Sequence, residues 1–298
     1  MEMNIYQVDA FTSNPFCGNP AGVVPDAKGI SKDIMQKIAY EINLSETAFV
    51  EPLSHEDFNV CFFTPICEVD LCGHATIATF YTLAKEGYIR PVENGIKTVY
   101  QITRAGRLPV EIKFTNNKVD YIIMEQAPPK SLGIVEDINP LLKTMGIGSS
   151  EIGTLDKSLK PEIISTGLSD IILPIRNKKT IDNLGVDFSK LTKISKELNV
   201  TGVHGFFLPE ENSKIVYTRN FAPLVGINEE AATGTSNGAL IYYLKKNNLI
   251  KDNSILSLQG ESLKRPSEIM CFYEEVNDKI KIKVGGKARI VIDGIINF

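Results

Sequence analysis

The pattern of apolar positions predicts four long helices. In residues 31–43, Ile34, Ile38 and Ile42 fall on one helical face, which is typical of an amphipathic helix packed against a core. The other three helices are predicted over residues 188–199, about 75–87 and about 236–247.

Segments rich in β-branched and aromatic residues separate these helices and predict many strands. In the first half of the chain they are residues 5–11, 47–52, 59–63, 99–105, 107–114 and 118–125. In the second half they are residues 162–175, 205–210, 214–221, 255–260, 268–274, 279–286 and 288–294. Two long helices per half among so many strands lack the regular alternation of a parallel sheet, so the pattern favours an α+β fold.

The two halves also resemble each other in sequence. KIAYEINL from Lys37 matches KISKELNV from Lys193, and FTPI from Phe63 matches FAPL from Phe221. GHATIATFYTLAKEGYI then matches GTSNGALIYYLKKNNLI, in the same order and with only small insertions. Such a repeat predicts one topology used twice.

A change of composition marks the boundary between the two halves. Pro and Gly residues interrupt the pattern near 126–135. We therefore predict an N-terminal half over residues 1–125 and a C-terminal half over residues 126–298, with the last strand packing back onto the N-terminal half.

Composition and charge narrow the class of protein. Hydrophobic residues make up 43% of the chain and charged residues 23%, which is ordinary for a globular protein, and the net charge of -4 argues against nucleic-acid binding. No apolar run approaches the roughly 18 residues that span a bilayer. Five cysteines without CxxC spacing, and a start without signal-peptide character, favour reduced thiols and a cytoplasmic location. Three scattered histidines favour no metal cluster.

The second predicted helix of each half begins at a glycine, Gly73 or Gly234. A helix N-terminus presents backbone N–H groups and a partial positive charge, and glycine lets a ligand approach them closely. Two such ends would suit a substrate carboxylate. The alternative is that each glycine only forms a tight turn before the helix.

The halves differ at positions that could carry proton transfer. Glu46 pairs with Gly202 in the repeat, and His74 pairs with Thr235, so the acid and the imidazole occur in one half only. Burial would raise the pKa of Glu46 towards values useful for general acid–base catalysis. The alternatives are an exposed glutamate at a strand edge and a histidine that caps a helix. Glu230, in a short insertion before the last helix, is likewise either a site residue or a helix-capping acid.

Cys72 precedes Gly73 at a predicted helix start, where a thiol pKa can be lowered. A two-thiol racemase would need a second cysteine in the matching loop, EEAATGTSN, which has none. We therefore interpret Cys72 as a wall residue of the site. The sequence also lacks Walker, HExxH and GxSxG motifs, and GIGSSEIG does not fit a dinucleotide-binding loop.

Four segments together resemble the PhzF family of phenazine-biosynthesis-like isomerases. They are VDAFTSNPFCGNPAGVV, NLSETAFV, FTPICEVDLCGHATIA and RNFAPLVGINEEAATGTSNG, and with them the resemblance covers nearly the whole chain. It implies the diaminopimelate-epimerase-like fold, with two pseudo-symmetric halves, each a curved, mostly antiparallel sheet around a central helix. It also implies a homodimer and a site between the halves.

The resemblance also implies roles for individual residues. The general acid–base role passes to Glu46, and His74 matches the histidine of the GHAT motif. Glu230 stands where the family has aspartate, and Thr235 where it has serine. The remaining residues expected to bind substrate are Ser45, Cys72, Gly73 and Gly234.

We therefore predict a cofactor-independent, metal-free isomerase that shifts a proton on a small carboxylated substrate. The best-known family member isomerises a dihydro-hydroxyanthranilate in this way. The alternatives are an epimerase or racemase with Glu46 and Glu230 as opposed bases, and a non-catalytic ligand-binding relative.

Overall fold

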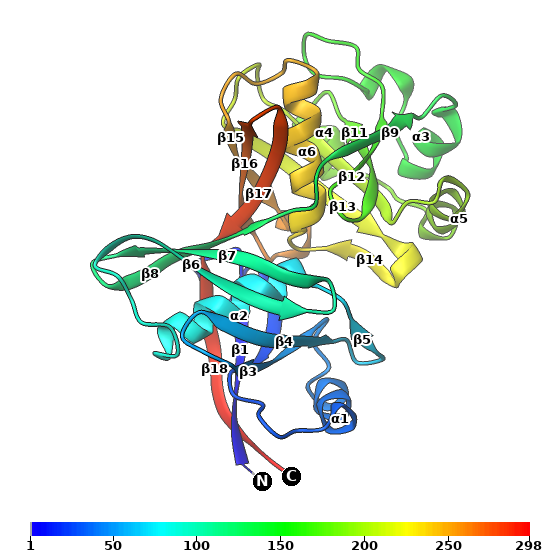
Figure 1. The fold of residues 1–298 in the computed structure, drawn as a ribbon. Helices are drawn as coiled ribbons and strands as arrows, with labels where there is room; N and C mark the ends of the chain where they lie inside the picture. The colour runs from blue at the N-terminus through cyan, green and yellow to red at the C-terminus, as the bar shows by residue number, and fades with distance from the viewer. Residues whose placement is uncertain (1) are drawn as a thin grey trace. The chain divides into compact units, whose positions relative to one another are not determined.

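The computed structural model describes residues 2–298, which form two compact units. The N-terminal unit extends to Glu125 and also contains Gly285–Phe298, whereas the C-terminal unit is the continuous segment Gln126–Val284. In Figure 1 the last strand, β18 (Ala288–Asn297, red), lies beside β1 (Glu2–Ala10, blue). This pairing is antiparallel and places the end of the sequence in the N-terminal unit.

The N-terminal unit is a mixed sheet around one helix. β1 pairs with β2 (Asn19–Val24), β2 runs parallel to β3 (Thr47–Pro52), and β3 pairs antiparallel with β4 (Asp57–Phe63). β4 then runs parallel to β6 (Asn94–Thr103), and antiparallel neighbours complete the sheet. The remaining elements are α1 (Lys32–Ile42), β5 (Glu68–Val69), α2 (Gly73–Lys85), β7 (Gly106–Thr115) and β8 (Lys118–Glu125).

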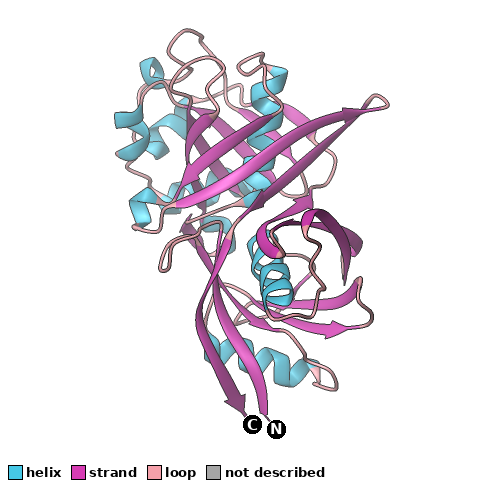
Figure 2. Ribbon diagram, turned by 90° about the vertical axis from the view of Figure 1, so that its left-hand side faces the viewer, coloured by secondary structure: helices cyan, strands magenta, loops and turns pink. Residues whose placement is uncertain are grey.

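Helix α2 is the central helix of this unit, as expected. It is buried on nearly all sides, including Thr76, Thr79 and Thr82, and it contacts strands β1, β2, β3, β7, β8 and β18. Figure 2 shows it enclosed by strands. Buried threonine hydroxyls need partners, and Thr76 and Thr82 find them in backbone carbonyls one turn earlier in the chain.

The C-terminal unit repeats this arrangement. β11 (Ser169–Pro174) runs parallel to β12 (Gly202–Phe207), β12 pairs antiparallel with β13 (Ile215–Ala222), and β13 runs parallel to β15 (Ser254–Gln259). Helix α6 (Gly234–Lys246) is the buried central helix and contacts β10, β11, β12, β15 and β16. The remaining elements are β9 (Lys130–Ile134), α3 (Asn139–Met145), β10 (Glu162–Ser165), α4 (Lys178–Asp182), α5 (Phe188–Leu198), β14 (Ile227–Glu230), β16 (Ser267–Val276) and β17 (Lys279–Gly286).

The alternation of parallel and antiparallel neighbours is therefore the same in both units. The pairs β2–β3, β3–β4, β4–β5 and β4–β6 correspond to β11–β12, β12–β13, β13–β14 and β13–β15. The four predicted long helices are confirmed as α1, α2, α5 and α6. The α+β fold and the internal repeat are thus both present.

Matching asparagines explain part of the sequence repeat. Helix α1 ends at Asn43 and helix α5 at Asn199, and both residues have a φ of 53°. Asparagine tolerates this left-handed conformation better than most residues and so ends a helix where the chain must turn. The pair Asn43/Asn199 is one of the identical positions of the repeat.

The C-terminal unit differs from the sequence prediction in several details, among them the unpredicted short strands β9 and β14. The segment 162–175 forms two antiparallel strands, β10 and β11, joined by a turn that contains Gly167 with a φ of 133°. Helices α3 and α4 were not predicted, because each is short. Asn139–Met145 nevertheless carries the local pattern of a helix, with Pro at its first turn and Gly146 in the left-handed region after it.

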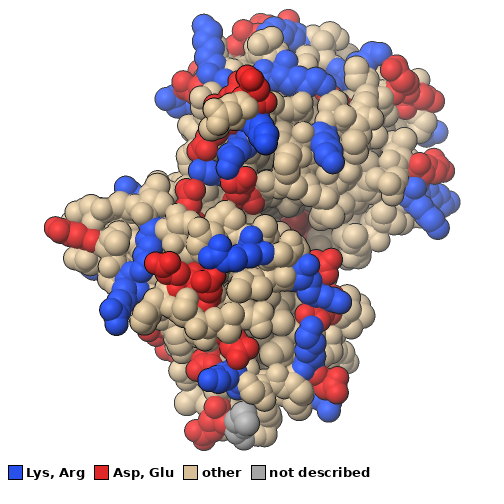
Figure 3. Space-filling model, in the orientation of Figure 1, with Lys and Arg blue, Asp and Glu red and all other residues tan. Residues whose placement is uncertain are grey.

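None of the helices over residues 2–298 is long and apolar enough to cross a membrane. On the face shown in Figure 3, acidic and basic side chains alternate over the surface rather than forming a broad basic area.

Candidate functional site

Four of the predicted site residues meet at the start of α2 in the N-terminal unit. Nε2 of His74 lies 3.1 Å from Oε2 of Glu46 and 3.2 Å from Oγ of Ser45. Its other ring nitrogen, Nδ1, lies 3.5 Å from Sγ of Cys72. The backbone places the acid, because the N–H of Gly22 in β2 donates to the Glu46 carbonyl at 2.9 Å and fixes the residue that precedes β3.

The electrostatics of this cluster make Glu46 a carboxylate and His74 an imidazolium. Burial raises the pKa of Glu46, but the charge and hydrogen bond of His74, with help from Ser45 and Cys72, lower it below the usual value. Burial would lower the pKa of His74, but Cys72 and Glu46 together raise it well above 6.5. We attribute this rise to the Glu46 carboxylate, because the buried thiol is itself neutral at neutral pH.

The expectation that burial would raise the pKa of Glu46 is therefore wrong. Desolvation does act in that direction, but an opposite charge at hydrogen-bond distance outweighs it. The sequence could not show this, because Glu46 precedes β3 whereas His74 lies in α2.

Cys72 is a buried thiol in contact with the imidazole. Burial raises its pKa, and so does the negative charge of Glu46, which together outweigh His74. The lowering expected at a helix start does not prevail. A neutral thiol beside an imidazolium fits the wall role inferred for Cys72 better than a nucleophilic role.

The three side chains Glu46, Cys72 and His74 also form a potential ligand set. Their ligand atoms all lie within 4.8 Å of one another. A carboxylate, a thiolate and an imidazole suit a thiophilic divalent cation such as zinc. Binding such an ion would require loss of the thiol proton and disruption of the Glu46–His74 ion pair.

The first turns of α2 and α6 are not closed by side-chain caps. Their N-cap residues, Cys72 and Thr233, make no side-chain cap hydrogen bond. A Cβ added at Gly73 would meet nothing nearer than Sδ of Met124, at 3.8 Å, so internal packing does not require a glycine there. Space therefore remains beside the backbone at the positive end of α2.

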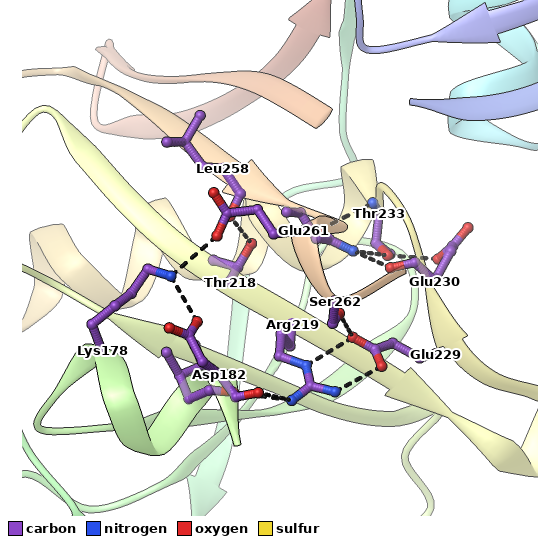
Figure 4. A network of polar contacts seen from close by, with 12 residues as sticks. Lys178, Asp182, Thr218, Arg219, Glu229, Glu230, Thr233, Leu258, Glu261 and Ser262 are labelled. Atoms are coloured by element: carbon purple, nitrogen blue, oxygen red, sulfur yellow. Dashed lines mark hydrogen bonds and ion pairs between the residues drawn. The ribbon is translucent and has the colours of Figure 1, made fainter. Parts of the chain in front are cut away.

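In the C-terminal unit, Glu230 lies at the end of β14 beside the start of α6. The Thr233 hydroxyl donates to Oε2 of Glu230 at 2.6 Å (Figure 4). The Gln259 amide donates to the Glu230 carbonyl at 2.8 Å. Gly234 is the buried first residue of α6, and the carbonyl of Thr235 accepts the hydroxyl of Thr166 at 2.8 Å.

The neighbouring Glu229 has a different environment. Arg219 holds its two carboxylate oxygens through Nε and Nη2, each at 2.8 Å, and Ser262 donates to it at 2.5 Å (Figure 4). A two-point contact with arginine occupies the carboxylate. The adjacent glutamates thus divide their roles, because Glu229 is held by Arg219 whereas Glu230 is directed to the start of α6.

A small cavity of about 230 Å³ lies beside Arg219, lined also by Tyr217 and Glu261. Lys178, at its edge, is paired with Asp182 at 2.6 Å and with Glu261 at 3.1 Å (Figure 4). The charged groups of this cavity are thus paired with one another, and none of the predicted site residues lines it.

The sequence motifs do not identify Thr233 and Gln259. The repeat contains a clue to the glutamine. The side chain of the fourth residue of each central helix, Thr76 or Asn237, lies within hydrogen-bond distance of the amide of a glutamine on the strand that follows the helix, Gln101 or Gln259. A comparison of buried polar positions between the two halves would have found this pair.

Known proteins resemble this sequence over nearly the full chain. The family model for phenazine biosynthesis-like proteins, PhzC-PhzF, matches residues 8–294. An uncharacterized isomerase from Clostridium acetobutylicum is 38% identical over 301 residues, which cover 97% of this chain and 96% of that protein.

Solved structures show the same fold. The crystal structure of a PhzF-family phenazine biosynthesis protein from Bacillus anthracis matches with a TM-score of 0.87 and 27% identity, over 100% of both chains. A hydroxyproline epimerase from Agrobacterium vitis, with bound trans-4-hydroxy-L-proline, matches with a TM-score of 0.61 and 12% identity over 99% of this chain and 92% of that one. At that identity the likeness is one of fold alone.

The fold and the relatives define an isomerase on an epimerase-like α+β scaffold. The chain belongs to the PhzC-PhzF family of phenazine biosynthesis-like proteins. The family resemblance of the four sequence segments is thereby confirmed.

Proposed function

We propose that the protein is a cofactor-independent isomerase in which Glu46 removes a proton from a carbon of a small carboxylated substrate and returns it at another carbon. The observation that carries this proposal is the buried ion pair between Glu46 and His74, 3.1 Å apart. It keeps Glu46 ionised before the substrate binds, which is the state that a general base needs.

A carboxylate with a lowered pKa is a weak base, so the substrate must be made more acidic. The backbone N–H groups at the start of α2, and the imidazolium of His74, supply positive charge for the carboxylate or enolate oxygen of the substrate. As negative charge moves from Glu46 to the substrate, His74 stays within reach of both groups. The Ser45 hydroxyl donates to the Glu46 carboxylate and so helps to hold it in place.

The C-terminal unit contributes Glu230, Gly234 and Thr235 in this proposal. Glu230 orients or polarises the same substrate, and the start of α6 adds a second set of N–H groups. The reaction thus needs residues of both units. From the family resemblance we further propose that the protein acts as a homodimer in the cytoplasm, and sedimentation measurements would test the dimer.

The decisive experiment follows deuterium uptake from deuterated buffer by two probes, a dihydro-hydroxyanthranilate and trans-4-hydroxy-L-proline. Glu46→Gln keeps the shape of the side chain but removes the base, so exchange should disappear while binding is retained. Glu51→Gln, at a half-buried glutamate of β3, is the matched control and should exchange like the wild type. Exchange at the wild-type rate in Glu46→Gln would refute the assignment.

The position of the label separates the two kinds of isomerase. Deuterium at a new carbon, with migration of the double bond, indicates the proposed proton shift. Deuterium at a stereocentre without such migration indicates an epimerase in which Glu46 and Glu230 act as opposed bases.

A further inference from the structure

A continuous chain of hydrogen bonds runs through the interior of the C-terminal unit and ends on Glu230. It links side chains of β11, β12, β13, β15 and α6 to the acid at the end of β14. Its members are Asp170, Ser236, Asn220, His204, Asn237, Gln259, Thr233 and Glu230.

In the middle of this hydrogen-bond chain, the orientation of the side-chain amides sets one direction of donation. Nδ2 of Asn220 lies 3.3 Å from Nδ1 of His204, and an amide nitrogen can only donate, so Nδ1 is the acceptor. Burial lowers the pKa of His204 to about 4, so the ring is neutral near pH 7 and carries its one proton on Nε2. That proton is donated to Oδ1 of Asn237, at 3.3 Å.

The direction continues to the acid. Because Oδ1 of Asn237 accepts from His204, its Nδ2 donates to the Thr233 carbonyl and to Oε1 of Gln259, each at 2.9 Å. Nε2 of Gln259 is thereby left to donate to the Glu230 carbonyl at 2.8 Å and to the Thr233 hydroxyl at 3.1 Å. The hydroxyl proton of Thr233 then points to Oε2 of Glu230.

A serine, a histidine and an aspartate in one buried network raise the question of a nucleophilic triad. The geometry argues against it, because the Ser236 hydroxyl donates to Asp170 and accepts from the Asn220 amide rather than contacting His204. Asp170, His204 and Ser236 are each at most 3% exposed, so a substrate cannot reach them. Their role is therefore to support the residues at the end of the chain.

We propose that Thr233 and Gln259 are positioning residues for Glu230. The buried hydrogen bonds that run from Asn220 towards Glu230 hold them in one orientation. The proposal rests on the proposed function, in which Glu230 takes part in the reaction. A glutamate at this position has one more rotatable bond than the aspartate of the resembling family. The Thr233 hydroxyl, which donates to the carboxylate, restricts that extra side-chain freedom, whereas Gln259, which donates to the carbonyl, holds the backbone of Glu230.

The test replaces the last donor and needs no substrate. Thr233→Val keeps the shape but removes the hydroxyl, Thr233→Ser retains it, and Thr218→Val removes a buried hydroxyl that bonds Ser257 at 2.9 Å outside the chain. Carboxyl-carbon NMR of glutamate-labelled protein, with Glu230 assigned by Glu230→Gln, reports the contact directly. Among these three variants, we expect the Glu230 resonance to shift in Thr233→Val and to keep its wild-type position in Thr233→Ser and Thr218→Val.

A second measurement tests the direction of the chain. Nitrogen NMR of histidine-labelled protein should show His204 protonated at Nε2 alone at pH 7, and Gln259→Leu should shift the Glu230 resonance as Thr233→Val does. An unchanged Glu230 resonance in both variants, or a His204 proton on Nδ1, overturns the proposal.

Proton exchange on the two probes separates this inference from the proposed function. With Glu230 in the reaction, Thr233→Val should lower kcat roughly 10-fold to 100-fold, with a smaller change in KM, because the acid is misplaced rather than lost. Shifted spectra together with wild-type exchange would show that Thr233 and Gln259 position Glu230 but that Glu230 takes no part in the reaction. That result overturns the role of Glu230 in the proposed function, not the hydrogen-bond chain.

Discussion

The imidazole of His74 bridges the carboxylate of Glu46 and the thiol of Cys72, with one ring nitrogen facing each group. Both nitrogens can donate only when the ring is protonated. The raised pKa of His74 and the lowered pKa of Glu46 therefore describe one unit, a buried ion pair that either partner needs in order to stay charged.

Removing one partner of this pair should cost stability. In His74→Gln the Glu46 carboxylate keeps its buried position without an opposite charge, which costs about 3 kcal/mol in the free energy of unfolding. The double variant His74→Gln/Glu46→Gln should recover most of that loss. Urea unfolding of the four proteins in a double-mutant cycle measures the coupling, and additive effects would contradict the ion pair.

The contribution of the ion pair to the free energy of unfolding should fall at both low and high pH. Glu46 has a lowered pKa in the folded protein. Its contribution to stability is therefore full above pH 4.5 and is lost as the pH falls through the pKa of the folded protein. His74 has a raised pKa, so its contribution is full below 6.5 and is lost as the pH rises through the folded value.

The stability difference between the wild type and the double variant should therefore be largest between about pH 4.5 and 6.5. Denaturant unfolding measured across the pH range would show a maximum in that interval. A difference that rises steadily towards pH 9 would contradict a raised pKa for His74.

A thiophilic cation should compete with the ion pair. We expect Cd²⁺ to bind at Glu46, Cys72 and His74, to give the ultraviolet absorption of a metal–thiolate bond, and to inhibit exchange on the two probes. Affinity should fall at lower pH because the thiol must lose its proton. Cys72→Ala should abolish the absorption, whereas Cys271→Ala, at a buried thiol of β16, should leave it intact.

The end of the hydrogen-bond chain that lies farthest from Glu230, at Asp170, should contribute to the stability of the C-terminal unit. Ser236 donates to Asp170, whose pKa burial raises despite this bond, so Ser236→Ala leaves a buried carboxyl short of a donor. We expect a loss of about 1–3 kcal/mol in the free energy of unfolding. Ser195→Ala is the matched control, because this buried hydroxyl has no hydrogen-bond partner among residues 2–298 and its removal should cost little.

The sequence predicted those parts of the fold that local patterns encode. The four long helices follow from apolar spacing. Asn43 and Asn199 occupy equivalent positions in the sequence repeat because each ends the corresponding helix of its unit. Helix α3 was missed because its seven residues are too few for a periodic pattern, although Pro140 and Gly146 bracket it.

The sequence could predict which residues belong to the candidate site, but not which of them are in contact. The motifs singled out Glu46 and His74, yet only their contact reverses the direction in which burial moves the pKa of Glu46. Thr233 lies at the start of α6 and Gln259 on β15, and nothing local to either residue shows that they meet. Contacts between elements distant in sequence set these properties.

The pairing of β18 with β1 has a consequence for the order in which the protein folds. The C-terminal unit is one continuous segment, whereas the N-terminal unit receives its last strand from the end of the sequence. On the ribosome, the edge of β1 that pairs with β18 therefore has no partner until the whole C-terminal unit has been made. This long interval is when a nascent chain is most exposed to pairing with another copy of itself.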